Sequence, residues 1–464
     1  MSSFLQYFEA IINLYNEYIG GYLILLLLVP TGIYLTFRLG FLQLRGLKHA
    51  FEIVCGKFSD KKHLGDITHF KALTTALSST VGTGNIVGVA LAVYWGGPGV
   101  VFWLWVTGFF GMMLKFSECT LALKYRIVNA DGTVSGGPMY YIKYGLKKQL
   151  GKFAKVLAAI FAFATVLCSL GTGNIAQANG IADALITNYQ IPTYVTGLII
   201  SFLVLIIIVG GLKRIAEVTE KLVPIMAGFY LLATMVVLIS YASHIPAAFQ
   251  LIFDSAFNGT ALTGGFVGST FFMTMIMGVR RGLFSNEAGQ GSAAIAHAAA
   301  KTEYPVREGF VATLEPLIDT IVICTLTALV VIVTDSWSSG IQGVGMTISA
   351  FELGFSNVGV VGVAKHIVAF GLVMFAFSTI ISWSYYGSRG VQYLVGDKYI
   401  KPYYYIYGLF VFLGSIWSID LVWGFVDMVI TFMTIPNLIA LILLFPVLKK
   451  EVQNYLALKK INKW

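Results

Sequence analysis

Long apolar runs, separated by short polar segments, dominate the pattern of residues along this chain. A window of about 20 apolar residues is long enough to cross a bilayer as a helix. The pattern predicts eleven membrane-spanning helices, at 20–38, 71–95, 99–123, 153–187, 194–212, 221–243, 263–300, 307–334, 358–388, 403–417 and 420–447. The polar segment at 39–70 predicts an amphipathic helix at the membrane surface. A short surface or re-entrant helix is expected at 341–352, where it could act as a lid.

The overall composition agrees with a membrane protein. Of the 464 residues, 57% are hydrophobic and only 11% are charged, whereas a soluble domain carries about a quarter charged residues. A soluble enzyme, a fibrous protein and a disordered chain are therefore excluded. The apolar runs are also much longer than the ~10-residue alternating strands of a membrane β-barrel. We expect an all-α membrane protein embedded in a lipid bilayer.

The formal net charge of +9 is explained by where the basic residues lie. Of the 31 Lys and Arg residues, 27 fall at Arg38 or in alternate connections, namely 39–71, 124–155, 213–221, 301–307, 389–401 and 449–464. The opposite set of connections contains none. Because basic loops stay in the cytoplasm, we expect a multi-pass protein of the cell (plasma) inner membrane, with its N-terminus outside and its C-terminus in the cytoplasm. The positive charge thus indicates orientation and does not predict a nucleic-acid partner.

Side chains that could carry enzymatic chemistry show no organised pattern. The four cysteines, Cys55, Cys119, Cys168 and Cys324, form no CxxC pair and are typical of small core residues. The six histidines are scattered, without an HExxH motif or a close pair. These observations argue against an enzyme and against a disulfide framework or a transition-metal site.

Glycine and polar residues cluster in the middle of three predicted spans, at 78–85, 171–177 and 277–291. Such clusters are costly at membrane depth unless they line a cavity. The first and the last of them open two groups of five spans. Interrupted helices at matching positions of two halves point to the central site of a transporter. Close helix packing, as at Gly84-x-x-x-Gly88, is the alternative explanation.

The span at 263–300 is too long for one membrane helix. We expect its interruption at Gly278, Arg280, Arg281 and Gly282, with ion pairs between the two arginines and nearby acids. An unwound helix exposes N–H groups that can bind a carboxylate and carbonyl groups that can bind Na⁺.

Two adjacent hydroxyl residues, Ser378 and Thr379, lie in the 358–388 span. On a membrane helix such hydroxyls commonly bond back to the preceding turn, but hard cations also prefer oxygen ligands. A Ser-Thr pair that faces unwound carbonyls would suit Na⁺, and spacing alone does not decide between these roles. Trp383 follows Thr379 by four residues on the same face, where it either packs against lipid or forms the wall of an apolar pocket.

Acidic residues within or near the predicted spans are Glu118, Asp183, Glu287, Glu315, Asp319 and Asp427. An ionisable group at this depth is a functional candidate by default. For most of them we favour an ion pair that packs or gates the helices over a substrate contact. Glu287 stands apart because it lies in the interrupted segment itself.

Four segments carry a resemblance to a known family: STVGTGNIVGVALA (79–92), GGPGVVFWLWVTGFFGMMLKFSE (96–118), GTGNIAQANGIADAL (171–185) and FSNEAGQGSAAIAHAAAKTEYPVREG (284–309). They resemble the alanine or glycine:cation symporter family over nearly the whole chain. The resemblance implies sodium-coupled secondary active transport of a small neutral amino acid, alanine or glycine, by alternating access. It implies no cofactor besides Na⁺ as the coupling ion.

The resemblance also implies a LeuT-type fold, in which ten core helices form two inverted five-helix repeats, preceded here by one extra N-terminal helix. The N-terminal helix and interfacial segment would occupy 1–70, the first repeat 71–243, the second repeat 244–447 and a cytoplasmic tail 448–464. Together these parts would form one integral membrane domain. The resemblance carries no prediction of the oligomeric state.

Mapped motif by motif, the resemblance assigns substrate binding to Thr83, Gly84, Asn85, Asn174, Gln177, Met277, Gly278 and Trp383. It assigns Na⁺ to the carbonyls of Ser78, Val81 and Phe375 and the hydroxyls of Ser378 and Thr379. Two other functions stay open. A proton-coupled amino-acid symporter would use Glu287 or Asp319 as its carrier. A passive channel would need a continuous polar stripe, which the clustered breaks do not provide.

Overall fold

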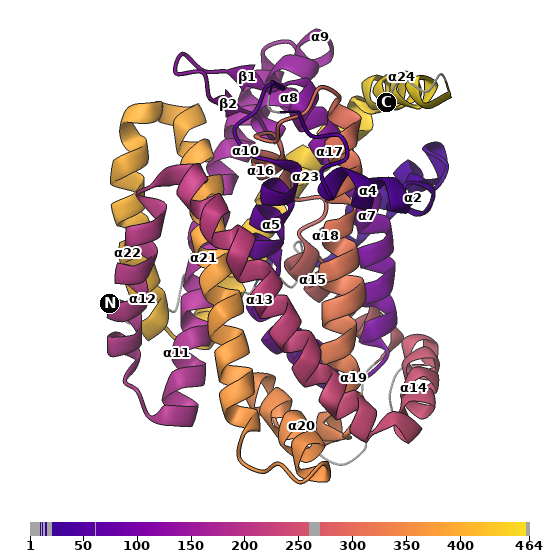
Figure 1. Ribbon diagram of the computed structural model, residues 1–464, viewed down its shortest axis with the longest axis vertical. Coiled ribbons are helices and arrows are strands. Elements are labelled where there is room, and N and C mark those ends of the chain that lie inside the picture. Colours follow the sequence, from indigo (N-terminus) through magenta and orange to yellow (C-terminus); the bar gives the residue numbers. More distant parts are fainter. Residues whose placement is uncertain are drawn as a thin grey trace.

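Long helices dominate the computed structural model, which describes residues 10, 12, 14, 15, 21–60, 62–258 and 270–460. Most of the long helices run roughly along the long axis of the molecule, and many short elements gather at its ends (Figure 1). A small antiparallel hairpin joins β1 (Ile127–Val128) and β2 (Val134–Ser135), with Ile127 opposite Ser135 and Val128 opposite Val134.

The helices before residue 260 are α2 (Gly21–Arg38), α3 (Leu42–Arg45), α4 (Leu47–Val54), α5 (His69–Thr80), α6 (Val89–Gly96), α7 (Val100–Lys124), α8 (Pro138–Gly145), α9 (Lys147–Leu150), α10 (Phe153–Leu170), α11 (Ala176–Tyr189), α12 (Thr193–Ile208), α13 (Gly211–Ser240) and α14 (Ile245–Asn258). Those after residue 270 are α15 (Phe271–Asn286), α16 (Ala293–His297), α17 (Pro305–Ala312), α18 (Leu314–Pro316), α19 (Thr325–Val333), α20 (Gly343–Asn357), α21 (Ala364–Val395), α22 (Ile400–Ile416), α23 (Ile419–Leu443) and α24 (Phe445–Lys460). Three π-helical segments, η2 (Gly84–Gly88), η3 (Gly171–Ile175) and η5 (Leu317–Cys324), and three 3₁₀ turns, η4 (Ala242–His244), η6 (Ser336–Ser338) and η7 (Asp397–Tyr399), complete the helical part.

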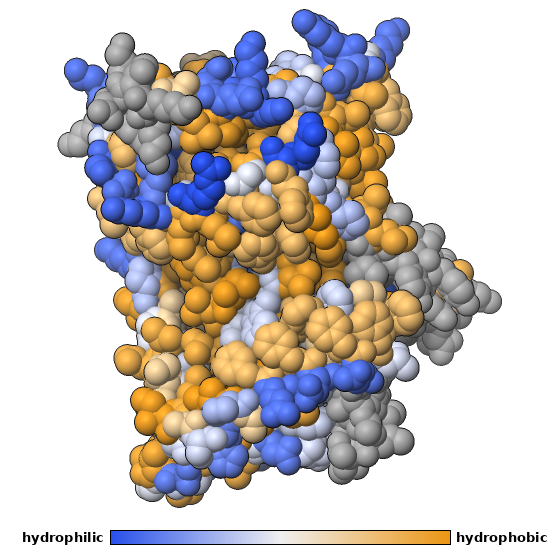
Figure 2. Space-filling model, turned by 90° about the vertical axis from the view of Figure 1, so that its right-hand side faces the viewer, coloured by the Kyte–Doolittle hydropathy of each residue, from blue (hydrophilic) through white to orange (hydrophobic). Residues whose placement is uncertain are grey.

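The outer surface of the helix bundle is apolar. Leu198 and Phe202 of α12 are 58% and 64% exposed, and Leu232 of α13 is 70% exposed. Such exposure is unfavourable in water and neutral in lipid, because lipid tails are themselves apolar. On the face seen in Figure 2, hydrophilic residues gather towards the two ends, and hydrophobic residues cover most of the surface between them.

Six helical segments are long and apolar enough to cross a membrane, or seven if the bent pair formed by α5 and η2–α6 counts as one span, among the residues the structure describes. Leu26–Arg38 and Thr193–Ile208 are shorter apolar helices. The mostly helical membrane architecture is therefore confirmed. The count of eleven spans stays a prediction, and the first 19 residues lie largely outside the described part of the chain.

Helices form in both segments where surface helices are expected, with changes. The 39–70 segment contains two helices, α3 and α4, because Gly46 separates them and packs directly against the ring of Phe310. The helix expected at 341–352 is α20, which extends to Asn357. It lies against η2, where the Thr347 hydroxyl is 3.4 Å from the carbonyl of Ile86.

The basic end of the molecule, at the top of Figure 1, carries α4, α8, α9, α24 and the β1–β2 hairpin. A cavity of about 380 Å³ lies there and is lined by Asp66, Asp131, Thr133, Val134, Gly210, Leu212, Lys213, Tyr385, Arg389, Gln392, Asp397 and Ile400. In the exposed hairpin turn, hydrogen bonds from the hydroxyl and backbone N–H of Thr133 lower the pKa of Asp131 below its usual value. This end therefore combines basic helices with acidic loop residues around a polar cavity.

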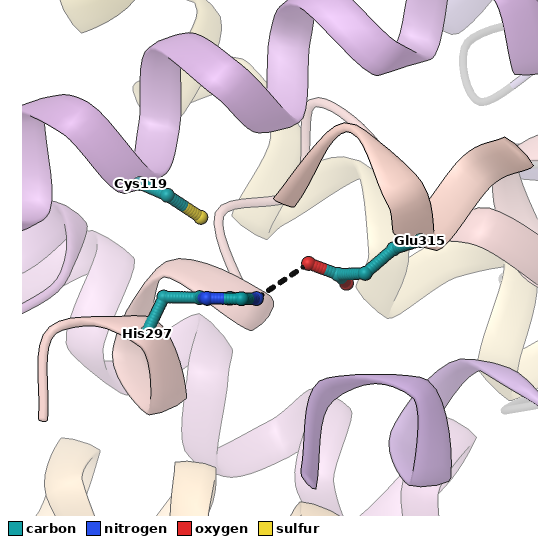
Figure 3. Close-up of side chains that lie close together, drawn as sticks. All are labelled: Cys119, His297 and Glu315. Atoms are coloured by element: carbon teal, nitrogen blue, oxygen red, sulfur yellow. Dashed lines mark hydrogen bonds and ion pairs between the residues drawn. The ribbon is translucent and has the colours of Figure 1, made fainter. Parts of the chain in front are cut away.

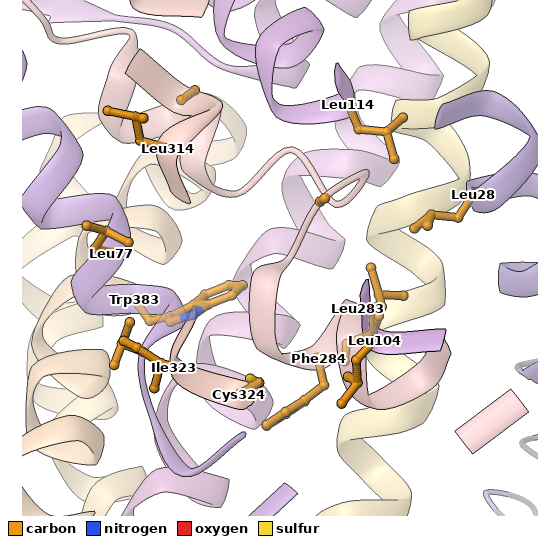
Figure 4. Close-up of a cluster of buried hydrophobic side chains, with 14 of the residues drawn as sticks. Leu28, Leu77, Leu104, Leu114, Leu283, Phe284, Leu314, Ile323, Cys324 and Trp383 are labelled. Carbon is orange, nitrogen blue, oxygen red and sulfur yellow. The ribbon is translucent and has the colours of Figure 1, made fainter. Parts of the chain in front are cut away.

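Hydrophobic side chains from several helices fill the centre of the molecule. Leu77 of α5, Ile323 of η5, Phe284 of α15 and Trp383 of α21 are all at most 5% exposed. Figure 4 shows these side chains lying around the ends of α5 and α15. The interrupted parts of the helices are thus surrounded by apolar packing.

The contact between α22 and the π-helical η3 requires glycine at position 414. A Cβ atom there would lie 2.7 Å from the Cα of Ile175 and 3.0 Å from its carbonyl oxygen, both of them backbone atoms that cannot rotate away. We expect Gly414→Ala to destabilise the protein by about 1–3 kcal/mol, seen as a lower melting temperature in detergent. Gly228→Ala in α13 is the control, because its Cβ would meet no atom within 4 Å. Equal melting temperatures for the two variants would contradict this prediction.

Candidate functional site

The first predicted break lies where the sequence places it. Thr68 caps the start of α5 by accepting a hydrogen bond from the backbone N–H of Lys71 at 3.2 Å, and the helix ends at Thr80. Val81 is extended, and the Asn85 side-chain oxygen accepts a hydrogen bond from the N–H of Gly82 at 2.9 Å. The chain resumes as η2 and α6, bent by 51° from α5. Asn85 therefore replaces a helical partner that the bend removes.

The five residues predicted to bind Na⁺ come together between this bend and α21. The Ser78 hydroxyl donates to the Ser378 carbonyl at 2.7 Å, and the Ser378 hydroxyl lies 3.3 Å from the Ser78 carbonyl. The Thr379 hydroxyl lies 3.3 Å from the Val81 carbonyl. Both α21 hydroxyls also lie near the Phe375 carbonyl, at 2.8 and 3.1 Å. The hydroxyls of Ser378 and Thr379 can thus bond back to the preceding turn and face the unwound carbonyls at the same time.

Gly82 connects this oxygen cluster to Gln177. A Cβ atom at Gly82 would lie 2.6 Å from the Thr379 hydroxyl and 2.9 Å from the Gln177 side-chain oxygen. That oxygen accepts a hydrogen bond from the N–H of Thr83 at 3.0 Å, while the Gln177 amide group donates to the Thr172 carbonyl in η3. The predicted residues Thr83, Gly84 and Gln177 therefore adjoin the oxygen cluster. The hydroxyls of Thr83 and Thr172 are buried without a partner among the described residues.

The second break differs from the prediction. Helix α15 runs without interruption through Gly278, Arg280, Arg281 and Gly282 to Asn286. Its end is set by Glu287 in the left-handed conformation (φ 54°), followed by Gly289 and Gly291 at φ 86° and 78°. The arginines expected between the two halves of this span therefore lie inside α15, and the guanidinium of Arg281 lies 6.0 Å from the ring centroid of Trp95. The stretch at 259–269, where the predicted span begins, lies outside the described residues.

Glu287 and Trp383 meet at the second break. The indole N–H of Trp383 donates to a Glu287 carboxylate oxygen at 2.8 Å, and the Ser292 hydroxyl donates to the other oxygen at 2.5 Å. Trp383 is fully buried, and Gly173 packs directly on it. The lipid-packing interpretation of Trp383 is therefore wrong, and its side chain forms an interior wall.

Two of the predicted substrate residues, Met277 and Gly278, lie elsewhere, whereas Asn174 lies in η3, two residues after Thr172. Met277 and Gly278 pack against the end of α6 and the start of α7, where they approach Gly96 and Trp103. The Asn174 amide donates to the carbonyl of Tyr407 in α22 at 2.8 Å. The premise that Met277 and Gly278 adjoin an unwound segment is wrong because α15 is continuous there.

Asp319 is a site neighbour whose partners the sequence did not reveal. Its carboxylate accepts hydrogen bonds from the Asn85 amide at 2.6 Å and from the hydroxyls of Ser285 and Thr320, both at 2.7 Å. Asp319 is fully buried in η5. Asn85 thus closes the first break with its oxygen and holds Asp319 with its nitrogen. The signal in the sequence was an acid within a span, without any indication of what it contacts.

Comparisons with known proteins show the family of this chain. The sequence profile of the sodium:alanine symporter family matches residues 5–463. The chain belongs to this family. The sodium/alanine symporter AgcS of Methanococcus maripaludis is 42% identical over 457 residues, which cover 98% of each chain. The probable sodium/glutamine symporter GlnT of Bacillus subtilis is 35% identical, with 99% of this chain aligned to 93% of that protein.

A solved structure is similar in fold. A Na⁺-coupled sialic acid symporter, in a substrate-bound outward-open state, superposes with a TM-score of 0.53 at 12% identity, covering 90% of this chain and 98% of that one. This similarity shows a helical membrane-transporter fold. The family and its relatives are secondary active transporters, which are not enzymes. The chain is therefore a multi-pass membrane transporter of the sodium:alanine symporter family.

Proposed function

We propose that this chain imports a small neutral amino acid, alanine or glycine, together with Na⁺ by alternating access. The observation that carries the proposal is the convergence of five oxygens between the bend after α5 and helix α21. These are the carbonyl oxygens of Ser78, Val81 and Phe375 and the hydroxyl oxygens of Ser378 and Thr379. The family membership and the sodium/alanine relative support the same conclusion.

The chemistry of the oxygen cluster fits Na⁺. Hard cations bind carbonyl and hydroxyl oxygens, and all five residues are at most 1% exposed. The Val81 carbonyl is free of the helical ladder because Val81 is extended. Since the five oxygens carry no formal charge, a monovalent cation can leave this site more easily than it could leave a buried carboxylate. Reversible binding of this kind is what a coupling ion requires.

The amino acid would lie on the other side of Gly82. The N–H groups at the start of η2, at Thr83 and Gly84, would face the substrate carboxylate. The buried hydroxyls of Thr83 and Thr172 and the Gln177 side chain would complete the polar contacts. Trp383, held by Glu287, would limit the side chain to the size of a methyl group. Asn85 would hold the break in shape without touching the substrate, because both ends of its amide are already bonded.

We further propose a LeuT-type arrangement of eleven spans, with two inverted five-helix repeats and the N-terminus outside. The bends after α5 and α15 support it, since each lies in the first span of one group of five. The basic end would face the cytoplasm. The cavity beside Tyr385 and Arg389 would then form part of the cytoplasmic release route.

Uptake of radiolabelled alanine and glycine into liposomes tests the proposal, with Na⁺ and H⁺ gradients imposed separately. We expect accumulation driven by an inward Na⁺ gradient in the absence of a pH gradient. Accumulation that requires only the H⁺ gradient would identify the proton-coupled symporter instead. Equilibration without accumulation under either gradient would identify a passive channel.

Thr379→Ala removes one of the five oxygens from the Na⁺ site. We expect the Na⁺ concentration for half-maximal alanine uptake to rise about tenfold, which corresponds to about 1.4 kcal/mol. Ser384→Ala on the same helix is the matched control, because its hydroxyl bonds back to the Ile381 carbonyl at 2.6 Å. Unchanged Na⁺ dependence in Thr379→Ala would remove this site from the proposal.

Gln177→Ala removes the side chain that joins the first break to η3. We expect the alanine affinity to fall about tenfold, because the N–H of Thr83 and the carbonyl of Thr172 lose a buried partner. Equilibrium binding of labelled alanine at saturating Na⁺ measures the change. Asn188→Ala, on α11 as well, is the control, since its amide bonds within its own helix to the Ala184 carbonyl. Wild-type affinity in Gln177→Ala would place the substrate elsewhere.

A further inference from the structure

Five buried ionisable side chains form a continuous chain towards the basic end. Its order is His69, Glu308, His297, Glu315 and Lys115. His69 Nδ1 bonds to Glu308 Oε2, and Glu308 Oε1 lies 2.6 Å from His297 Nδ1. His297 Nε2 lies 2.7 Å from Glu315 Oε1, and Glu315 Oε2 lies 3.0 Å from Lys115 Nζ. Each of the five side chains is at most 1% exposed.

The chain joins five different helices: α5, α17, α16, α18 and α7. In the sequence the histidines are scattered and form no motif. In the structure Glu308 bridges His69 and His297, which are 228 positions apart in the sequence. Figure 3 shows the His297 ring directed towards the Glu315 carboxylate, with the Cys119 thiol nearby.

The hydrogen-bond geometry fixes how many protons the links must share. Each link between a ring nitrogen and a carboxylate oxygen needs one proton between the two atoms. A neutral His297 carries a single N–H, so its other nitrogen would point a lone pair at a carboxylate. Both links of His297 are satisfied at once when the ring is protonated on Nδ1 and Nε2. The link of His69 requires only its own Nδ1 proton, and its buried Nε2 has no partner among the described residues.

The balance of charge leads to the same conclusion independently. With Glu308 and Glu315 ionised, Lys115 charged and His69 neutral, a protonated His297 brings the summed formal charge of these five side chains to zero. Loss of that proton would leave one uncompensated negative charge among fully buried groups, which is costly. The other ionisable groups that act on Lys115 are Glu118, Glu287 and Cys119, and Arg126 acts on Glu308.

A metal ion is the competing occupant of this place. Ligand atoms of Cys119, His297 and Glu315 lie within 4.8 Å of one another. However, both nitrogens of His297 already face carboxylates, and the ammonium group of Lys115 contacts Glu315 at 3.0 Å. A cation added between them would meet this ammonium charge. The arrangement therefore favours a proton over a metal.

We propose that His297 is a proton-binding site, loaded when the basic end is closed and emptied when that end opens. In the closed state the protonated His297 ring donates from Nδ1 to Glu308 and from Nε2 to Glu315. On opening, the Nδ1 proton passes to Glu308 and from there to water, which leaves His297 neutral and Glu308 ionised. The site is thus a second ion-binding site of the transporter, specific for H⁺ and distinct from the five-oxygen cluster.

The start of α5 couples this site to opening. His69 is the first residue of α5. The loop before it is hydrogen-bonded to the segment that follows His297. The Asp66 N–H donates to the Ala299 carbonyl at 2.7 Å, and the Lys301 N–H donates to the Ile67 carbonyl at 2.8 Å. Helix α5 leads directly to the Na⁺ and substrate break. Movement of this helix away from α17 would break the His69–Glu308 link and admit water; this step rests on the proposed alternating access. By linkage, acid at the basic end then favours the closed state.

The pH dependence of thermal unfolding of the full-length protein in detergent tests the site directly. A group that holds its proton in the folded state stabilises that state at low pH, and this contribution is lost as the pH rises. We expect the folded-to-unfolded ratio of the wild type, relative to His297→Gln, to fall up to tenfold per pH unit in the alkaline range. His63→Gln is the control, because His63 lies at the same end, 3.9 Å from Glu303, outside the chain. It should keep the wild-type profile.

Glu308→Gln provides a second variant in case His297→Gln does not fold. Without the Glu308 charge, the linked side chains are already neutral when His297 is unprotonated. The His297-dependent change of the folded-to-unfolded ratio with pH should therefore disappear. A wild-type profile in either folded variant would overturn the proposal, as would stabilisation by zinc that depends on Cys119. Sodium-driven alanine uptake, measured after the same proteins are reconstituted into liposomes, separates the two proposals. Intact uptake without the His297-dependent pH profile removes the proton site alone. Loss of uptake with the profile intact removes the symport mechanism alone.

Discussion

Backbone polar groups that leave a helix inside an apolar bundle must find other partners, and the central part of this protein depends on that constraint. Side-chain amides meet it at both breaks. Asn85 accepts from the N–H of Gly82, Gln177 accepts from the N–H of Thr83, and Gln290 donates to the Leu283 carbonyl. The carbonyl groups that turn towards α21 instead meet the hydroxyls of Ser378 and Thr379. The unwinding that removes helical hydrogen bonds, and so costs stability, therefore also creates oxygen ligands.

Buried charge obeys the same requirement. Asp319 is held by neutral donors, Glu287 by an indole and a hydroxyl, and Glu308 and Glu315 by two histidines and a lysine. These groups lie around the interrupted helices and not on the lipid face. Apolar residues surround them, so each partner is worth more than it would be in water. These four carboxylates thus lie in connected hydrogen-bond networks, and moving one helix must rearrange several contacts together.

The apolar spans, the first break and the hydroxyl pair of α21 could be recognised because each rests on local sequence, whereas the carbonyl ligands of the five-oxygen cluster were implied only by the family resemblance. Apolar length sets a span, Gly82 and Asn85 adjoin the bend they produce, and the hydroxyls are neighbours on one helix. The second break was misplaced because a glycine has two uses. Gly278 allows α15 to approach Trp103 closely while remaining helical, whereas Gly289 and Gly291 adopt positive φ. Composition does not distinguish these uses, because the difference lies in what packs against each residue.

The sequence by itself determined that this chain crosses a membrane, which of its connections are basic, and where α5 is interrupted. These properties depend on transfer of residues from water to lipid and on the conformations available to nearby residues. Only the tertiary structure decided that Trp383 faces Glu287 and that His69 and His297 share Glu308. Such contacts join residues distant in the chain, and their strength comes from a buried environment that forms only when several helices pack together. The number of protons held by these linked side chains is accordingly a property of the folded bundle.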